Sequence, residues 1–423
     1  MTKEVPASSS AGGAASPPVY NPLEPSNDRY KFFEWSRQHD PVHLTPLFNV
    51  RLITRYDDVV ALAKEPQRFS SCDFMKPWVP VPNEVTALIA AEGFPLVPTL
   101  VDSDPPAHHR IRFLFSASFT PRRIEQMESG VRAICHELVD GFRRDGQVDI
   151  LKHFAFRLPM TVIMDLLGVP RKDMDQVKSW HNDFVNMYGM DIPLEQHLTW
   201  ARSLIAYQRY YEALLLERQM HPRDDLATAL VQAQLNGSHF SMAEMIWQMI
   251  ILLTAGHETT TSMICSMLYH LLKNPELLRA IDSDPGLIPA AIEETLRLEA
   301  PIQYEPRITT EPVELRGVAI PKGARLHLMF GSASRDPEVF PEPDRFDLYR
   351  EGNRTRTSGH LAFGHGVHFC LGAPLARLEG RVALEVLRER LPNLRLPAGF
   401  TAEWLPHPLF HGLRALPLQW DVT

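Results

Sequence analysis

The sequence predicts a mainly α-helical fold of the α+β class, with one long central helix and small β-sheets. Apolar residues recur at helical spacing through most of the chain, as expected of amphipathic helices. Strand signals are short and fall in two stretches, residues 42–54 and 313–330. In the second stretch, Pro321, Lys322 and Gly323 supply a turn. These patterns favour helices over strands in most of the chain.

The composition is that of a folded protein with a large core. The chain has 423 residues, of which 44% are hydrophobic and 22% are charged. Its formal net charge of -8 argues against nucleic-acid binding, which relies on excess positive charge. No stretch approaches the ~20 apolar residues that cross a bilayer, and the N-terminus lacks the order of a signal peptide. We therefore expect a cytoplasmic protein without a membrane span.

Residues 1–18 differ from the rest of the chain. They are rich in Ser, Ala, Gly and Pro and contain little to bury, so we expect a disordered leader. The sequence shows no internal repeat and no second long linker. We therefore expect residues 19–423 to form one domain.

The best-defined helix begins at Ser241, which forms a capping box with Glu244. Apolar residues continue to Leu272, and Asn274 and Pro275 end the helix. About 32 residues at 1.5 Å per residue give a length of ~48 Å. A helix of this length would cross the whole domain.

An unusual segment, Ala-Gly-His-Glu-Thr-Thr at residues 255–260, interrupts the apolar pattern of this helix. Gly and Thr are poor helix formers, and Glu258 lies among apolar neighbours. A packing role for Gly256, with Thr hydroxyls bonded to the preceding turn, is as good an interpretation as a functional site. A zinc-protease motif is excluded, because His257 and Glu258 would need a second His where the chain has Thr261.

The strongest functional signal is the segment FGHGVHFCLG at residues 363–372, directly before an apolar helical pattern. Its glycines permit a tight turn around the Cys370 sulfur, and nearby amide N–H groups and the helix dipole favour a thiolate. Such a sulfur suits a metal ion. Zinc held by His365, His368 and Cys370 is an alternative, although this spacing is unusual for zinc and no second cluster completes the site.

This segment resembles the haem-binding loop of the cytochrome P450 superfamily, Phe-Gly-x-Gly-x-His-x-Cys-x-Gly, and in particular that of its soluble bacterial branch. Other segments match family motifs in the family's order: DPPAHHRIR at residues 104–112, the insert at residues 255–260, ETLR at residues 294–297, Arg307, and Arg335-Asp336-Pro337 before Phe346. The resemblance covers residues 20–423. The sequence departs from the pattern at Ser334, where many relatives carry Asn.

The resemblance implies a cofactor and the residues that hold it. The chain would bind haem b (iron protoporphyrin IX), with Cys370 as an iron ligand whose thiolate favours cleavage of the O–O bond. His108 and Arg112 are spaced i, i+4 and so share a helical face, where the resemblance implies contacts to the haem propionates. The full set of implied propionate contacts is His108, Arg112, Arg307 and His368. Further implied haem contacts are Ala255, Phe363, Gly364 and Gly372.

Catalytic roles are implied for three residues of the insert. Gly256 would let dioxygen and substrate approach, Thr259 would hydrogen-bond bound dioxygen, and Glu258 would help to relay protons. A structural salt bridge is the alternative for Glu258. The resemblance implies that Glu294 and Arg297 are buried and hold the haem pocket in place. Their spacing alone also permits an ordinary surface ion pair.

The resemblance also places substrate contacts in apolar and aromatic segments, with ordinary core packing as the alternative for each residue. The candidates are Phe74, Trp78, Phe184, Met187, Ile251, Leu252, Ile302, Tyr304, Leu409 and Phe410. Together they favour a lipophilic substrate of terpenoid, steroid, polyketide or fatty-acid type.

The implied function is that of a monomeric monooxygenase that inserts one atom of O2 into such a substrate. No flavin or iron–sulfur segment is evident, so a ferredoxin and a ferredoxin reductase would supply the electrons. A basic patch would steer the acidic partner, and its residues are Arg110, Arg122, Arg123, Arg354 and Arg356. The alternatives are a haem-thiolate peroxygenase, a ligand-binding haem protein, and a helical interaction protein without haem.

Overall fold

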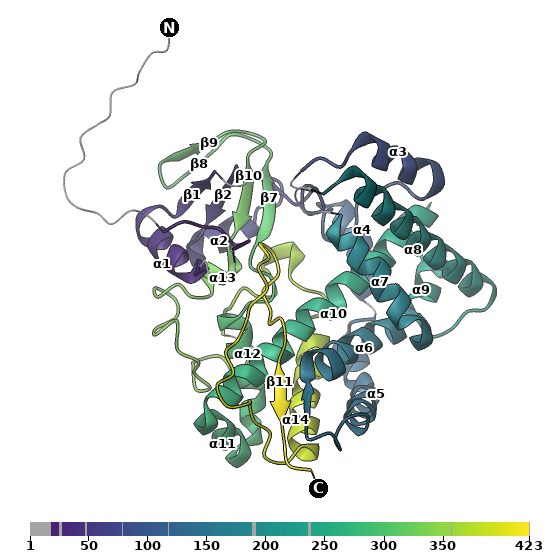
Figure 1. Cartoon of the computed structure of the whole chain (residues 1–423). Coiled ribbons are helices and arrows are strands. Elements are labelled where there is room, and N and C mark those ends of the chain that lie inside the picture. The colour runs from purple at the N-terminus through teal and green to yellow at the C-terminus, as the bar shows by residue number, and fades with distance from the viewer. Residues whose placement is uncertain are drawn as a thin grey trace.

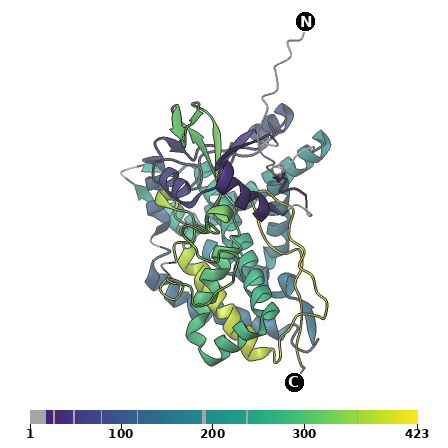
Figure 2. The ribbon, with the colours of Figure 1, turned by 90° about the vertical axis from the view of Figure 1, so that its left-hand side faces the viewer.

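A computed structural model describes residues 18–24, 28–46, 49–77, 79–116, 118–187, 192–235, 238–356 and 358–422. The expected leader at residues 1–18, except Pro18, and the candidate Trp78 therefore lie outside the described residues. The fold is mainly α, as predicted, and its largest sheet lies at one end of the molecule (Figures 1 and 2).

Helices form most of the structure, and none of those described is long and apolar enough to cross a membrane. The helices are α1 (Arg29–His39), α2 (Tyr56–Ala63), α3 (Asn83–Glu92), α4 (Ala107–Ser116), α5 (Pro121–Asp140), α6 (Arg157–Leu167), α7 (Met174–Asn186), α8 (Leu194–Met220), α9 (Leu226–Gln232), α10 (Met242–Lys273), α11 (Pro275–Ser283), α12 (Ile288–Leu298), α13 (Phe330–Ala333) and α14 (Ala373–Arg390).

Among the described residues, the strands form one five-stranded sheet, in the order β1-β2-β10-β7-β3, and three two-stranded sheets, β11-β4, β5-β6 and β8-β9. All pairs are antiparallel except β2 with β10. The strands are β1 (Val42–Thr45), β2 (Val50–Ile53), β3 (Phe69–Ser70), β4 (Gln147–Asp149), β5 (Gln234–Leu235), β6 (Ser238–His239), β7 (Glu305–Thr309), β8 (Val313–Leu315), β9 (Val318–Ile320), β10 (Arg325–Leu328) and β11 (Pro417–Gln419).

The two predicted strand regions contain β1 and β2, and β8 to β10. The predicted turn is present before β10, where Gly323 has a φ of 80°, a value that favours glycine. Strand β7, which pairs with β10 and carries Arg307, was not predicted from the sequence.

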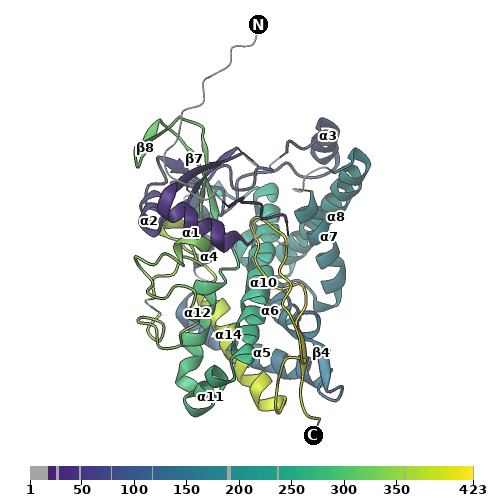
Figure 3. The same cartoon turned by 60° about the vertical axis from the view of Figure 1, so that its left-hand side comes forward.

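Helix α10 runs through the middle of the molecule (Figure 3). Its N-cap is Ser241, and the predicted capping box is present because Ser241 N donates to Glu244 Oε2 at 2.8 Å. The helix has 32 residues and ends before Pro275, which begins α11. It packs against α6, α8, α12 and α14. The largest apolar cluster contains residues of both α10 and α14, so these two helices belong to one packed body.

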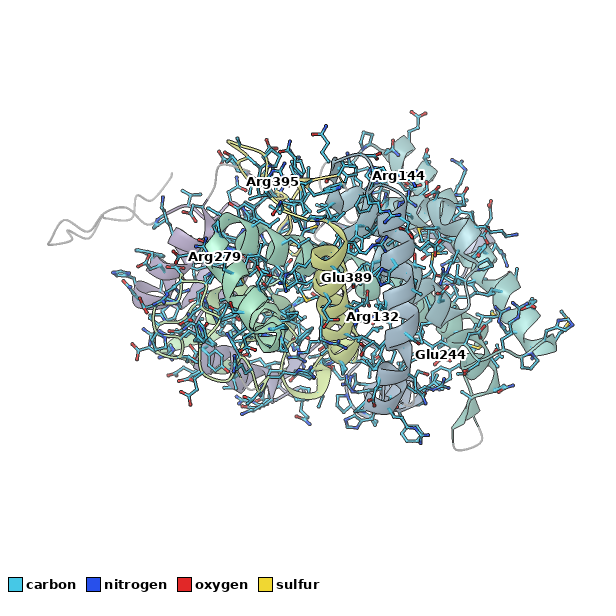
Figure 4. All side chains as sticks on the ribbon, turned by 90° about the horizontal axis from the view of Figure 1, so that it is seen from below. Arg132, Arg144, Glu244, Arg279, Glu389 and Arg395 are labelled. Carbon is cyan, nitrogen blue, oxygen red and sulfur yellow. The ribbon has the colours of Figure 1, made fainter. Side chains whose placement is uncertain are left out.

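Helices α5 and α14 lie side by side, as Figure 4 shows with Arg132 on α5 and Glu389 on α14. Ion pairs cross between them: Arg381 Nη2 lies 2.6 Å from Glu128 Oε2, and Arg132 pairs with Glu385. Apolar packing and these ion pairs fix α14, so the loop before it starts from a rigid support.

Candidate active site

Cys370 lies at the end of a tight loop directly before α14. Gly364 and Gly366 both have a φ of 72°, and only glycine adopts this conformation without strain. The loop closes through Cys370 N, which donates to the Phe363 carbonyl oxygen at 2.8 Å. A Cβ atom on Gly366 would collide with the carbonyl oxygen of Ala63 in α2. The glycines therefore let the loop turn and also let it press against a neighbouring helix.

Burial and the neighbouring polar groups shift the pKa of the Cys370 thiol in opposite directions. Burial raises the pKa of the Cys370 thiol, whereas the amides of Gly372 and Ala373 and the charges of Arg112 and Arg377 lower it. Burial dominates, so the thiol form is favoured when no cation is present. A metal cation at the sulfur would reverse this balance, because the thiolate is the form that binds metals.

The zinc alternative at this loop is not supported. Within the part of the chain that the structure describes, no group of three close His, Cys, Asp or Glu side chains includes Cys370. His368 instead contacts Ser71 Oγ through Nε2 at 2.9 Å. Ser71 is in turn held by its backbone N–H, which donates to Asp104 Oδ1 at 2.9 Å. His368 is thus fixed by neighbours that the sequence analysis did not single out.

Two histidines lie against each other beside the Cys370 loop. The rings of His108 and His368 are 4.5 Å apart. Burial and the charge of Arg112 lower the pKa of His108 to about 4, and burial and the charge of Arg307 lower the pKa of His368 to about 3. Both rings are therefore neutral near pH 7. His108 is fully buried, and neither of its ring nitrogens has a hydrogen-bond partner among the residues that the structure describes.

Two arginines, Arg112 and Arg307, lie near these histidines. Arg112 Nη2 donates to the Phe369 carbonyl oxygen at 2.8 Å. Arg307 is 1% exposed, and its Nη2 lies 2.9 Å from Glu305 Oε2. Within the described part of the chain, neither atom has a partner with hydrogen-bond geometry. Buried donors are rarely left without partners. These donors therefore indicate a ligand that carries anionic groups.

Glu305 was missed in the sequence analysis. It lies two residues before Arg307 on β7, where alternate residues share a face. Burial raises the pKa of its carboxyl group, although the charge of Arg307 opposes this. Recognition of β7 as a strand would have placed Glu305 beside the predicted arginine.

An apolar cavity of about 280 Å³ extends from the Cys370 loop to α10. The predicted haem contacts that line it are His108, Arg112, Ala255, Phe363, Gly364, His368 and Gly372, together with Cys370. Arg307 lines a second cavity that adjoins the first. A thiol, apolar walls and donors suited to two carboxylates fit haem b, which carries iron and two propionates.

The insert of α10 faces this cavity. Ala255, Gly256, Thr259 and Thr260 line it, and Thr259 Oγ1 donates to the Ala255 carbonyl oxygen at 3.0 Å. The packing role considered for Gly256 has support, because a Cβ atom there would lie 2.8 Å from Ile163 Cγ1 in α6. Because Gly256 has no side chain, α10 can pack closely on α6, and only the backbone of Gly256 lines the cavity.

Glu258 points away from the cavity toward α7. It forms a salt bridge with Lys178, and its Oε1 lies 3.2 Å from His257 Nε2 and 3.7 Å from His181 Nε2. Burial by itself raises the pKa of Glu258, but the neighbouring His181, His257 and Lys178 hold this pKa well below its ordinary value. The salt bridge considered as an alternative is therefore present, and Glu258 is ionised.

Glu294 and Arg297 are both completely buried in α12. Arg297 Nη2 donates to Glu294 Oε1 at 2.8 Å. Arg297 also donates to the carbonyl oxygens of Ser334, Pro343 and Arg345 at 3.0, 2.6 and 3.0 Å. A surface ion pair is excluded by this burial. The pair ties α12 to the chain segment that follows α13 and leads to the Cys370 loop.

Several predicted substrate contacts line the first cavity: Phe74, Ile251, Leu252, Ile302, Leu409 and Phe410. The adjoining cavity has a volume of about 570 Å³. The predicted contacts that line it are Phe74, Phe184, Ile251, Tyr304, Leu409 and Phe410.

Met187 differs in position from the other candidates of this set. It is absent from the walls of these two cavities as far as the chain is described, and it packs at the end of α7 in the main apolar cluster.

The predicted basic patch is largely neutralised by acids of the same chain. Arg110 pairs with Glu244, Arg354 pairs with Asp284, and Arg123 Nη2 lies 3.0 Å from Asp224 Oδ1. Ion pairs between distant segments of a sequence could not be recognised from residue type alone. This surface therefore has fewer unpaired arginines than its residue types alone suggest.

Comparison with known proteins identifies the family. The sequence profile described as Cytochrome P450 matches residues 89–284 and 286–390. The chain is 38% identical over 421 residues to the cytochrome P450 monooxygenase PikC of Streptomyces venezuelae, which covers 97% of this chain and 96% of the relative. It is 41% identical over 326 residues to the mycinamicin IV hydroxylase/epoxidase of Micromonospora griseorubida, with 76% and 79% covered.

A solved structure agrees with these relatives. Cytochrome P450 CREJ in complex with (4-ethylphenyl) dihydrogen phosphate superposes with a TM-score of 0.86 at 30% identity. The match covers 93% of this chain and 97% of that chain. Sequence identity, fold and the geometry around Cys370 lead to one conclusion: this chain belongs to the cytochrome P450 family and is a haem-thiolate monooxygenase.

Proposed function

We propose that this monooxygenase oxygenates an elongated, mostly apolar molecule that ends in a polar group, with electrons supplied by a ferredoxin and its reductase. The observation that carries the proposal is the second cavity, of about 570 Å³, which adjoins the cavity that haem would fill. Pockets for small ligands commonly have volumes of ~300–1,000 Å³. Their shared wall consists of Phe74, Ile251, Thr254, Leu409 and Phe410. A long ligand in the second cavity would reach past this wall toward the haem.

The two cavities differ in chemistry along this path. The first is walled mainly by apolar side chains and contains Cys370 and Thr259, so the reacting end of the substrate would be apolar. The second contains Asp73, Lys76 and Arg325. Arg325 Nε donates to Asp73, and Lys76 Nζ lies 3.3 Å from Asp73 Oδ1. Two cations beside one carboxylate leave capacity for a hydroxyl, carbonyl or carboxylate of the substrate.

The reaction proposed is hydroxylation or epoxidation, as in the name of the relative that acts on mycinamicin IV. When bound, haem b activates dioxygen, and electron donation from the Cys370 thiolate favours O–O cleavage. The protein must then deliver protons to one side of the cavity. Thr259 Oγ1 holds a proton where α10 faces the cavity, and Glu258, with a side chain 34% exposed, would connect this position to solvent.

An external electron donor is required by this chemistry. The sequence has four cysteines, and Cys135 and Cys265 are buried, so an iron–sulfur cluster within the chain has no support. A ferredoxin and its reductase would supply the electrons. Electrostatic steering of the ferredoxin would depend on few unpaired arginines, because three of the five predicted arginines are already paired with acids of the same chain.

The polar-end proposal predicts a graded response to ligands of equal length. Palmitic acid and hexadecanol should shift the haem spin state at concentrations about tenfold lower than hexadecane, since a hydrogen bond to a charged group is worth about 1.5–3 kcal/mol. Absorption titrations of the ferric holoenzyme measure this. Arg325→Met should remove the preference, whereas Arg279→Met, at an exposed position on α11, should keep it. Equal affinities for all three ligands in the parent protein would contradict the proposal.

The assignment of Cys370 predicts the loss of one spectral feature. In Cys370→His, thiolate donation disappears, so the red-shifted Soret band of the ferrous carbonyl complex should vanish even if haem is retained. Cys265→Ser, which changes a buried cysteine of α10, should keep the band. A band that persists in Cys370→His would show that another residue ligates the iron.

The propionate contacts predict weaker haem retention in two variants. His108→Ala and Arg112→Ala should each speed haem transfer to apomyoglobin by about tenfold, because an unpaired buried polar group costs about 1–3 kcal/mol. His109→Ala changes an exposed neighbour and serves as the matched control. If both variants retain haem as tightly as the control, these side chains do not hold the propionates.

The role of Thr259 predicts that oxygen consumption and product formation separate in Thr259→Ala. Without the hydroxyl, dioxygen takes up two electrons and two protons and leaves as hydrogen peroxide, so product per reductant consumed should fall at least about tenfold. Activity driven by added hydrogen peroxide should decline less. Thr261→Ala is the control, since Thr261 Oγ1 donates within α10 to the His257 carbonyl oxygen at 2.8 Å. An unchanged coupling ratio in Thr259→Ala would remove Thr259 from proton delivery.

A further inference from the structure

Four polar side chains meet where α7 crosses α10: Lys178 and His181 from α7, and His257 and Glu258 from α10. We call this group the α7–α10 cluster. One nitrogen of each histidine and one oxygen of Glu258 all lie within 4.8 Å of one another. Both histidines are buried, with His181 1% and His257 0% exposed. Such a gathering of imidazole and carboxylate groups is costly to bury unless each member has a partner.

The orientation of both rings directs Nε2 toward the centre of the cluster. His257 Nδ1 lies 2.7 Å from the Leu253 carbonyl oxygen, which fixes the proton on Nδ1 and leaves a lone pair on Nε2. His181 Nδ1 lies 3.3 Å from Thr254 Oγ1, and its Nε2 faces Glu258. A histidine whose outer nitrogen is held by a carbonyl or hydroxyl is the usual arrangement in metal sites.

The cluster already holds a cation, which is the ammonium group of Lys178. Its Nζ lies 3.2 Å from His257 Nε2 and donates to Glu258 Oε1. The ammonium thus occupies the position between two ligand atoms that a metal ion would take. The Lys178 side chain is 22% exposed, and its Nζ lies over the Phe156 ring, 5.2 Å from the ring centre. It therefore has a path to solvent if another cation displaces it.

The distances between the ligand atoms suit zinc. Bonds of about 2.0–2.1 Å in a tetrahedral zinc site place neighbouring ligand atoms about 3.3 Å apart. Glu258 Oε1 lies 3.2 Å from His257 Nε2 and 3.7 Å from His181 Nε2. Two imidazoles and one carboxylate form a ligand set that zinc uses with water in the fourth position. Magnesium and calcium prefer oxygen ligands and would not compete.

We propose that the α7–α10 cluster is a zinc site in which His181, His257 and Glu258 bind the ion and the Lys178 ammonium is displaced. The side chain of Glu258 is 34% exposed, so the ion can enter from solvent. Bound zinc would tie α7 to α10 and hold the Glu258 carboxylate in place. Zinc would therefore inhibit turnover, a consequence that rests on the proposed proton path through Glu258, whereas zinc binding itself does not.

The test is calorimetric titration of the tag-free ferric holoenzyme with Zn²⁺ in a buffer that does not bind metals. The parent should bind one equivalent. His181→Ala and His257→Ala should each weaken binding by at least about tenfold, since each removes a ligand. Lys178→Met should tighten binding, because it removes the competing cation and keeps all three ligands. His153→Ala removes an exposed histidine and should leave the affinity unchanged, and Mg²⁺ should give no binding heat.

X-ray absorption at the zinc edge provides an independent readout that haem iron does not obscure. The parent complex should show two imidazole ligands, and Lys178→Met should show the same set. Unchanged zinc affinity in both histidine variants, or a Lys178→Met variant that binds zinc no more tightly than the parent, would overturn the assignment. Because binding is measured without turnover, its failure is distinguishable from failure of the proposed oxygenation.

Discussion

The burial of one cysteine sulfur at the start of α14 is the constraint on which the rest of the structure depends. Burial raises the pKa of the Cys370 thiol, and the surrounding amides and the charges of Arg112 and Arg377 only partly oppose this. A functional thiolate here needs a metal cation above it and a loop that cannot relax away from that cation. The two left-handed glycines and the contact with α2 provide such a loop.

A rigid loop needs rigid neighbours, and buried charge provides part of this rigidity. Arg297 joins Glu294 to three backbone carbonyls, so one guanidinium connects α12 with the segment after α13. Breaking a buried ion pair by removing one partner costs several kcal/mol, typically about 3–5. Ion pairs between α5 and α14 add a second, partly exposed brace. Both devices hold the chain on the Cys370 side of the cavity.

Helix α10 forms the cavity wall opposite the Cys370 loop. At this wall its sequence contains residues with low helix propensity. Gly256 and the Thr residues lower helix propensity, yet a capping box and packing on α6 and α14 keep the helix continuous. Thr259 faces the cavity, whereas Glu258 faces Lys178 and two histidines. Consecutive residues of one helix thus serve two different environments, because each step along an α-helix turns the side chain by about 100°.

The sequence by itself determined the elements whose signals are local. The cap at Ser241, the stop at Pro275, the loop glycines and the Cys370 motif depend on neighbouring residues, so α10 and the turn of the Cys370 loop could be predicted. Tertiary structure decided which distant side chains meet. Only packing showed that Gly256 faces Ile163, that Met187 lies in the core, that Glu305 joins Arg307, and that acids of the same chain neutralise three of the predicted arginines. Contacts of this kind depend on the relative placement of whole elements, which residue type and spacing do not encode.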